Sequence, residues 1–165
     1  MASVSSDYIN LGNDTFVRKD LVKSFERKND FGDVSLALAN GMVVNFNPDM
    51  PSAMGKSGKM TIDEKDGTII FNNFNKQWAT VIGTDGDDRL NFVNSSQVTV
   101  HPGKGKDNVA FDSSVLMRVY YNESSPHQMV TVDGKSDVDV SVNKPARSRQ
   151  ENSDGKTVTH YWFEG

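Results

Sequence analysis

The sequence predicts an all-β protein with one short N-terminal helix, in which a parallel β-roll or short β-helix-like coil is flanked by hairpins. Apolar residues come in short alternating runs separated by Gly, Asn, Asp and Ser, which is the period-2 pattern of half-buried strands. Two glycine-containing segments, residues 83–92 and 102–111, resemble each other in sequence. The second segment begins nineteen residues after the first, at 102 and 83. An antiparallel β-sandwich is the alternative fold.

The chain of 165 residues has the size of one domain, and we treat residues 1–165 as a single domain. A formal net charge of −4 argues against a nucleic-acid partner. The absence of Cys excludes disulfides and thiolate metal sites. No apolar run is long enough to span a bilayer, and residues 1–14 lack the basic and apolar regions of a Sec signal peptide. We therefore expect no transmembrane segment, and secretion by a route without such a signal peptide.

One amphipathic helix is predicted over residues 17–30. Val17, Leu21, Val22 and Phe25 fall on one stripe at helical spacing, with charged residues elsewhere. The stripe predicts a surface helix that packs on the core.

Three strand–turn–strand patterns predict hairpins, each around a dipeptide that favours a tight turn. These dipeptides are Asn40-Gly41, Asp66-Gly67 and Asp154-Gly155. At the first dipeptide we expect both turn residues to have positive φ. Residues 47–59 are rich in Pro, Gly and Ser and predict a flexible loop.

The two similar segments align without gaps. Gly86 falls over Gly105, Asp88 over Asp107, Leu90 over Val109, and Phe92 over Phe111. A turn, strand, turn, strand unit of this length is what one coil of a β-roll or β-helix requires. We place this coil at approximately residues 80–121.

These segments resemble the hemolysin-type calcium-binding repeat of the RTX family of secreted bacterial proteins, whose nonapeptide is Gly-Gly-x-Gly-x-Asp-x-apolar-x. The first segment matches four of the five defining positions, with Gly83, Gly86, Asp88 and Leu90. The second also matches four, with Gly103, Gly105, Asp107 and Val109. Thr84 and Pro102 replace the remaining glycines.

The resemblance implies a secreted bacterial β-roll module with a structural, secretion or interaction role, in which calcium lies between loops one coil apart. Ca²⁺ takes about six to eight oxygen ligands, and glycine lets backbone carbonyls approach it without a Cβ clash. In this family the ligands are Asp side chains and carbonyls of the glycine-rich turns. The metal-site residues that the resemblance implies are Gly83, Asp85, Gly86, Asp88, Gly103, Gly105 and Asp107.

Two lysines in the second loop leave the calcium question open. Lys104 and Lys106 fall over Asp85 and Asp87 at the same offset of nineteen. If the coils are in register, these residues form two Asp/Lys pairs that stabilise the bend without metal. A metal-free coil therefore remains an alternative, and ordinary Asp-Gly turns in another β fold are a third.

Two further functions stay open. One is a metal-independent β-sandwich interaction or effector protein with a host or cell-surface partner. The other is a polysaccharide lyase or epimerase-related domain, because parallel β-helix lyases use Asp, Lys and Arg. The residues of this chain that could form such a group are Asp87, Asp88, Arg89 and Lys106. The aromatic run at residues 160–163 suits either a carbohydrate partner or a terminal core strand. The histidines lack zinc-ligand spacing and no Gly-x-Ser-x-Gly elbow occurs, so a binding module is favoured over an enzyme.

Overall fold

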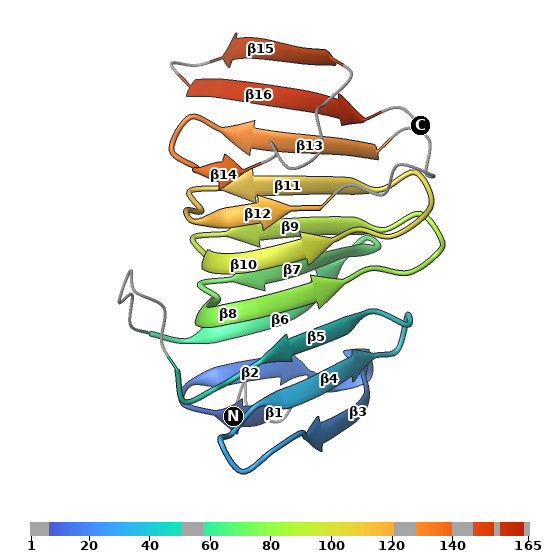
Figure 1. Ribbon diagram of the computed structural model, residues 1–165, viewed down its shortest axis with the longest axis vertical. Helices are drawn as coiled ribbons and strands as arrows, with labels where there is room; N and C mark the ends of the chain where they lie inside the picture. The colour runs from blue at the N-terminus through green and yellow to red at the C-terminus, as the bar shows by residue number, and fades with distance from the viewer. Residues whose placement is uncertain (1–6, 51–57, 121–127, 140–146, 154–155, 164–165) are drawn as a thin grey trace.

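The computed structural model describes residues 7–50, 58–120, 128–139, 147–153 and 156–163, which form two stacked β-sheets (Figure 1). The nine-stranded sheet has the spatial order β1 (Tyr8–Gly12), β2 (Thr15–Arg18), β6 (Met60–Lys65), β7 (Thr68–Asn72), β9 (Arg89–Val93), β11 (Asn108–Asp112), β13 (Gln128–Asp133), β16 (Lys156–Phe163), β15 (Arg147–Ser153). The seven-stranded sheet has the order β14 (Val138–Asp139), β12 (Met117–Val119), β10 (Ser96–His101), β8 (Asn75–Ile82), β5 (Val43–Phe46), β4 (Val34–Leu38), β3 (Val22–Arg27).

The middle of the molecule is a parallel β-solenoid of about three turns. Each turn gives one strand to each sheet, so that β7, β9, β11 and β13 pair in parallel on one side. On the other side β8, β10, β12 and β14 pair in parallel. The predicted β-roll architecture is confirmed, and the antiparallel sandwich is not formed in this part of the chain.

The predicted register of nineteen residues is confirmed. In β9 and β11, Leu90 lies opposite Val109 and Phe92 opposite Phe111. In β8 and β10, Val81 lies opposite Val100 with the same offset. A whole-number register brings equivalent residues of successive turns together, as a repeat architecture requires.

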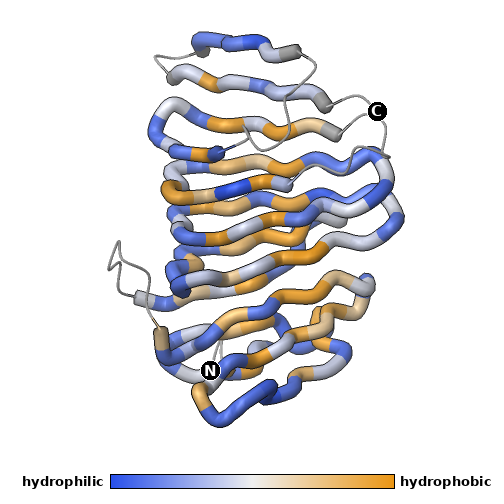
Figure 2. The backbone as a smooth tube through the Cα atoms, in the orientation of Figure 1, coloured by the Kyte–Doolittle hydropathy of each residue, from blue (hydrophilic) through white to orange (hydrophobic). Residues whose placement is uncertain are grey.

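The core consists of columns of equivalent residues from successive turns. The rings of Phe71, Phe92 and Phe111 stack with centroid separations of 4.6 and 5.3 Å and interplanar angles of 10° and 13°. Such ring pairs contribute about 0.5–1.5 kcal/mol each beyond their buried area. Figure 2 shows the alternation along the central strands, where apolar residues recur between polar ones.

Antiparallel elements close both ends of the solenoid. β3, β4 and β5 form a meander at the N-terminal end, and β15 and β16 form a hairpin at the C-terminal end. The edge strand β3 is mostly exposed and carries Lys23, Glu26 and Arg27. Charged, exposed edge strands resist pairing with another chain.

The helix predicted over residues 17–30 is wrong. Val17 lies in β2, and a single 3₁₀ turn covers Lys19–Leu21. Residues 22–27 form β3, which pairs with β4. Val17 and Leu21 are buried as expected, whereas Phe25 is 43% exposed. Val and Phe are weak helix formers and good strand formers, and pairing with β4 satisfies the backbone that a helix would bond internally. Tertiary pairing therefore overrides the helical spacing.

The first two predicted hairpins are confirmed. Asp66 and Gly67 have φ of 53° and 83° and join β6 to β7. Between β4 and β5 only Gly41 of the dipeptide has positive φ, at 100°, and its N–H bonds the Leu38 carbonyl at 2.9 Å. That turn is therefore longer than the two-residue turn expected. β15 and β16 pair as the third pattern predicts, while its turn, residues 154–155, and residues 51–57 of the predicted loop lie outside the described residues.

Candidate functional site

The predicted calcium-site residues lie in two adjacent connections, which we call the glycine–aspartate bends. Residues 83–88 join β8 to β9, and residues 102–107 join β10 to β11, at the right of Figure 1. The Gly83 N–H donates to the His101 carbonyl of the next turn at 2.7 Å. The structure therefore brings together both halves of the predicted site.

Three of the four glycines let the two bends stack in close contact. A Cβ on Gly83 would lie 2.1 Å from the Pro102 carbonyl oxygen. A Cβ on Gly103 would lie 2.5 Å from the Thr84 oxygen, and one on Gly105 would lie 2.4 Å from the oxygen of Gly86. Gly103 and Gly105 also have positive φ, 83° and 99°, which L-residues adopt only with strain.

Gly86 differs from these three glycines. The nearest atom to a Cβ on Gly86 is 3.7 Å away, so a side chain there has room. Its N–H donates to the Thr84 hydroxyl at 3.1 Å.

Asp88 closes its own bend. Its side chain is 6% exposed, and its carboxylate accepts bonds from the Thr84 N–H at 2.7 Å and the Thr84 hydroxyl at 2.8 Å. Burial raises the pKa of Asp88, and the two bonds from Thr84 oppose this rise. Thr84 stands where the RTX nonapeptide has its second glycine, and its hydroxyl gives the buried carboxylate a donor that glycine lacks.

Asp107 ties the two turns together. It is 2% exposed, and its Oδ1 accepts a bond from the Asp88 N–H at 2.8 Å. Outside it, the exposed Asp87 accepts a bond from the backbone N–H of Lys106 at 2.8 Å. In both cases a carboxylate of one turn accepts a bond from a backbone amide of the neighbouring turn.

The Asp/Lys ion pairs expected across the bends are not formed in the described residues. Asp87 meets the main chain of Lys106 instead of its ammonium group. Asp85, Lys104 and Lys106 all have exposed side chains. An exposed ion pair contributes little, whereas a carboxylate bond to a backbone amide satisfies a donor that the bend leaves open.

The calcium site that the resemblance implies stays a prediction, and its carboxylate oxygens already accept hydrogen bonds. Calcium takes about six to eight oxygens, but both Asp88 oxygens face the Thr84 donors and one Asp107 oxygen faces an amide. Across the described ranges, no group of three or more acidic or histidine side chains gathers at one point. The residues that would hold calcium are Asp88 and Asp107, and most of the shell would have to come from carbonyls and water.

The opposite side of the solenoid carries a serine column that the sequence analysis missed. The Ser95 N–H donates to the Ser114 hydroxyl at 3.1 Å, and the Ser114 N–H donates to the Ser136 hydroxyl at 2.9 Å. The Ser95 hydroxyl in turn accepts a bond from the Phe74 N–H at 3.0 Å. The signal was present, because Ser95 and Ser114 are also nineteen residues apart.

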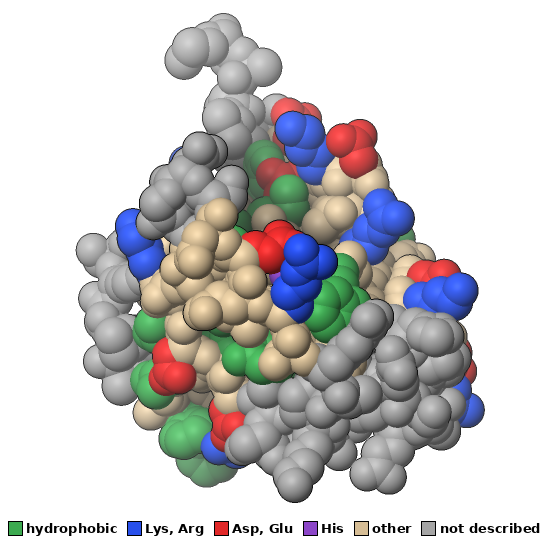
Figure 3. Space-filling model, turned by 90° about the horizontal axis from the view of Figure 1, so that it is seen from above, with side chains coloured by type: hydrophobic (Ala, Val, Ile, Leu, Met, Phe, Trp, Pro, Cys, Tyr) green, Lys and Arg blue, Asp and Glu red, His purple; other side chains and the backbone are tan. Residues whose placement is uncertain are grey.

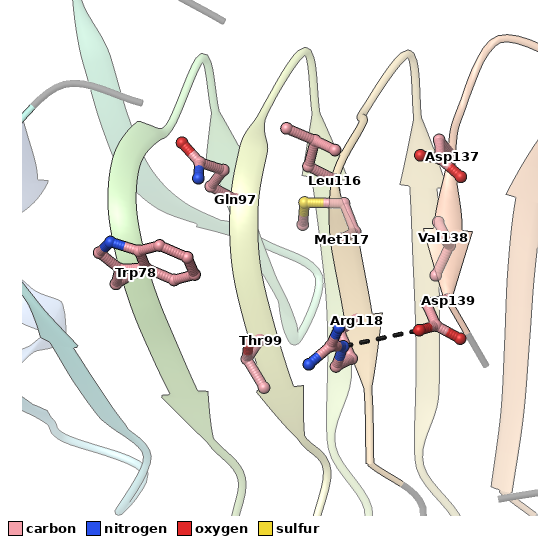
Figure 4. Close-up of a pocket in the computed structure, with 9 residues that line it drawn as sticks. All are labelled: Trp78, Gln97, Thr99, Leu116, Met117, Arg118, Asp137, Val138 and Asp139. Carbon is pink, nitrogen blue, oxygen red and sulfur yellow. Dashed lines mark ion pairs between the residues drawn. The ribbon is translucent and has the colours of Figure 1, made fainter. Parts of the chain in front are cut away.

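A second missed feature is a groove of about 640 Å³ on the outer face of the seven-stranded sheet. Its walls include Trp78, Gln97, Thr99, Leu116, Arg118 and Asp139 (Figure 4). Trp78 is 74% exposed, and no sequence pattern singled it out.

Charge on the surface is mixed. Figure 3, which looks down on the molecule, shows Lys and Arg interspersed with Asp and Glu around the rim. The absence of a nucleic-acid partner stays a prediction from the net charge. None of the helices in the described ranges is long and apolar enough to cross a bilayer.

The chain shows no similarity that assigns its function. No protein-family model matches it, and comparison with curated proteins and with solved structures gave no significant match. Function is therefore inferred from the residues and their geometry.

Proposed function

We propose that this protein is a non-enzymatic, secreted bacterial β-roll module with a structural or interaction role, related to the RTX repeats and held together without metal at its glycine–aspartate bends. The β-solenoid fold supports the module, and the matches at Gly83, Asp88, Gly105 and Asp107 support the relationship.

The observation that carries the proposal is the set of bonds made by Asp88 and Asp107. Both side chains are buried, and both use their oxygens to satisfy donors of the bends. Leaving a buried donor unsatisfied costs about 1–3 kcal/mol. The bends therefore have an internal alternative to a cation.

The test compares Asp88→Ala and Asp107→Ala with the control Asp85→Ala by urea unfolding in a chelator. We expect each buried substitution to lower the free energy of unfolding by about 1–3 kcal/mol. The exposed Asp85 should change it by less than about 0.5 kcal/mol. Equal effects at all three positions would show that the carboxylates do not hold the bends.

The non-enzymatic part of the proposal rests on how the candidate lyase residues are used. Asp88 is buried against Thr84, and Asp87 accepts a bond from the Lys106 backbone. The two carboxylates therefore accept bonds from different partners and do not face one common substrate groove. Incubation with uronate polymers should give no ultraviolet absorption from unsaturated products, and product formation lost in Asp88→Asn would overturn this part.

Calcium stabilisation of the same bends is the second candidate. It is favoured by the burial of two carboxylates, one from each turn, at the same bend. A ligand that binds only the folded state raises its stability by mass action. This candidate expects millimolar calcium to raise the Tm by several degrees and the pair Asp88→Asn, Asp107→Asn to abolish the rise, whereas the first proposal expects no shift.

A further inference from the structure

The groove on the outer face of the seven-stranded sheet is made by four successive strands, β8, β10, β12 and β14 (Figure 4). With strands about 4.8 Å apart, four strands span about 14 Å, which is longer than a single sugar-sized ring. The groove is therefore elongated along the solenoid axis.

Three groove residues share an unusual backbone conformation. Trp78, Gln97 and Leu116 have φ of 61°, 56° and 54°, and they occupy equivalent positions in successive turns. Positive φ is uncommon for residues other than Gly, and rare for bulky ones. Such conformations persist where the surrounding structure enforces them, and they cluster at binding sites.

Trp78 presents a large aromatic surface to solvent. It is 74% exposed, and it also borders a second groove of about 510 Å³ that is lined by Asn45, Met50 and Gln77. Within the described residues, the buried side-chain oxygen of Asn45 has no hydrogen-bond partner. Trp78 therefore borders two grooves, and each of them has polar residues in its lining.

The polar groups beside Trp78 include both donors and acceptors. Arg118 Nε lies 3.6 Å from Asp139 Oδ2, and both side chains are about half exposed, at 51% and 41%. Gln97 and Thr99 add an amide and a hydroxyl to the same wall. Asp137 also borders the groove, so its formal charge is −1, from one Arg and two Asp.

These features together select the class of ligand. An aromatic plane beside mixed donors and acceptors matches a sugar ring, which has an apolar C–H face and a rim of hydroxyl groups. The negative charge disfavours polyanions such as uronate polymers and nucleic acids. The lining mixes apolar residues such as Leu116 and Val138 with charged and amide groups, whereas the centre of a protein–protein interface is depleted of charged residues.

We propose that this groove binds a neutral oligosaccharide, with one ring stacked on Trp78 and hydroxyls bonded to Gln97, Thr99 and the Arg118–Asp139 pair. This names the partner of the interaction role and rests on the proposed function for that role. The site itself uses none of the residues of the glycine–aspartate bends, so the two can fail independently.

The test is calorimetric titration of the full chain with a panel of soluble linear neutral oligosaccharides, and with a uronate oligomer as the anionic comparison. We expect at least one neutral glycan to bind, Trp78→Ala to weaken it tenfold or more, and Trp78→Tyr to retain most of the affinity. Arg118→Met should weaken binding without abolishing it. The control Trp162→Phe, in β16 and outside the groove, should leave the affinity unchanged.

Three results would overturn the proposal. They are the absence of binding at millimolar concentration across the panel, binding that Trp78→Ala and Arg118→Met leave unchanged, and a preference for the uronate oligomer. Circular dichroism of every variant establishes that it is folded. A negative titration together with destabilising Asp88→Ala and Asp107→Ala would reject the glycan site and leave the module proposal standing.

Discussion

At the scale of single residues, the glycines of one bend have different tasks. Gly83 gives the Pro102 carbonyl room to approach, whereas Gly86 faces open space. Neither has positive φ, so a left-handed backbone does not require glycine at either position. They form a matched pair for testing how closely the turns stack.

We expect Gly83→Ala to lower the free energy of unfolding by about 3 kcal/mol or more, because the new methyl group meets backbone of the neighbouring turn. The free energy of unfolding of Gly86→Ala should lie within about 0.5 kcal/mol of the wild-type value, or slightly above it, because Ala restricts the unfolded chain. Urea unfolding measures both. Similar values for the two variants would contradict the close stacking of the bends.

His101 gives the molecule a pH dependence that can be isolated. Its ring stacks on Tyr120 of the next turn at 4.9 Å and 8°, and burial lowers its pKa below the ordinary value of 6.5. Above 6.5 the imidazole is neutral in both states and its contribution to stability is complete. As the pH falls, the unfolded chain takes up the proton first, so stability decreases until the folded-state pKa is passed.

When the pH is lowered from about 8 to about 5, the Tm of the wild type should therefore decrease more than the Tm of His101→Gln. The other histidines are present in both proteins, so the difference between the two curves reports on His101. Parallel curves would contradict the burial of the ring.

At the scale of elements, the serine column acts as the counterpart of the glycine–aspartate bends. The Ser114 hydroxyl accepts a bond from the Ser95 N–H. It also donates toward two carbonyls, that of Phe92 at 3.2 Å and that of Asp112 at 3.1 Å. Ser95, Ser114 and Phe92 are buried, so bulk water cannot replace the bonds among them.

Ser114→Ala should cost about 1–3 kcal/mol, because it leaves the Ser95 amide without its acceptor. The exposed Ser24 in β3 supplies the control, and Ser24→Ala should change stability by less than about 0.5 kcal/mol. Thermal unfolding followed by circular dichroism compares them. A small effect at Ser114 would show that water reaches this bend.

The pairing of β9 with β11 was predictable because an ungapped repeat fixes which residues meet. The hairpin at Asp66-Gly67 was predictable because its turn chemistry is local. The segment over residues 17–30 was not, since the spacing of Val17 and Leu21 suits a helix and the partner strand β4 lies outside the window. Trp78 was missed because a left-handed conformation at a non-glycine residue leaves no mark in the sequence.

The candidate site was predictable only in part. The stacking of Asp88 over Asp107 followed from the offset, but the donors that their oxygens face did not. Thr84 looked like a defect in a repeat, and in the structure it is the main partner of Asp88. Lys106 looked like an ionic partner, and its backbone is used instead.

At the scale of the whole molecule, the solenoid is held from two sides and closed at both ends. Hydrogen bonds of the glycine–aspartate bends connect successive turns on one side, and those of the serine column connect them on the other. Antiparallel strands cap both ends of the stack. The central proposal is that the bends need no cation, because their buried carboxylates already accept bonds from backbone amides.

Native-state amide hydrogen exchange at Thr84 and Asp88 tests this claim most directly, since these amides donate to the two buried carboxylates. In a chelator we expect both amides to exchange as slowly as those of the core strands β9 and β11, and calcium to leave their rates unchanged. Fast exchange in the chelator that becomes slow only when calcium is added would contradict the account.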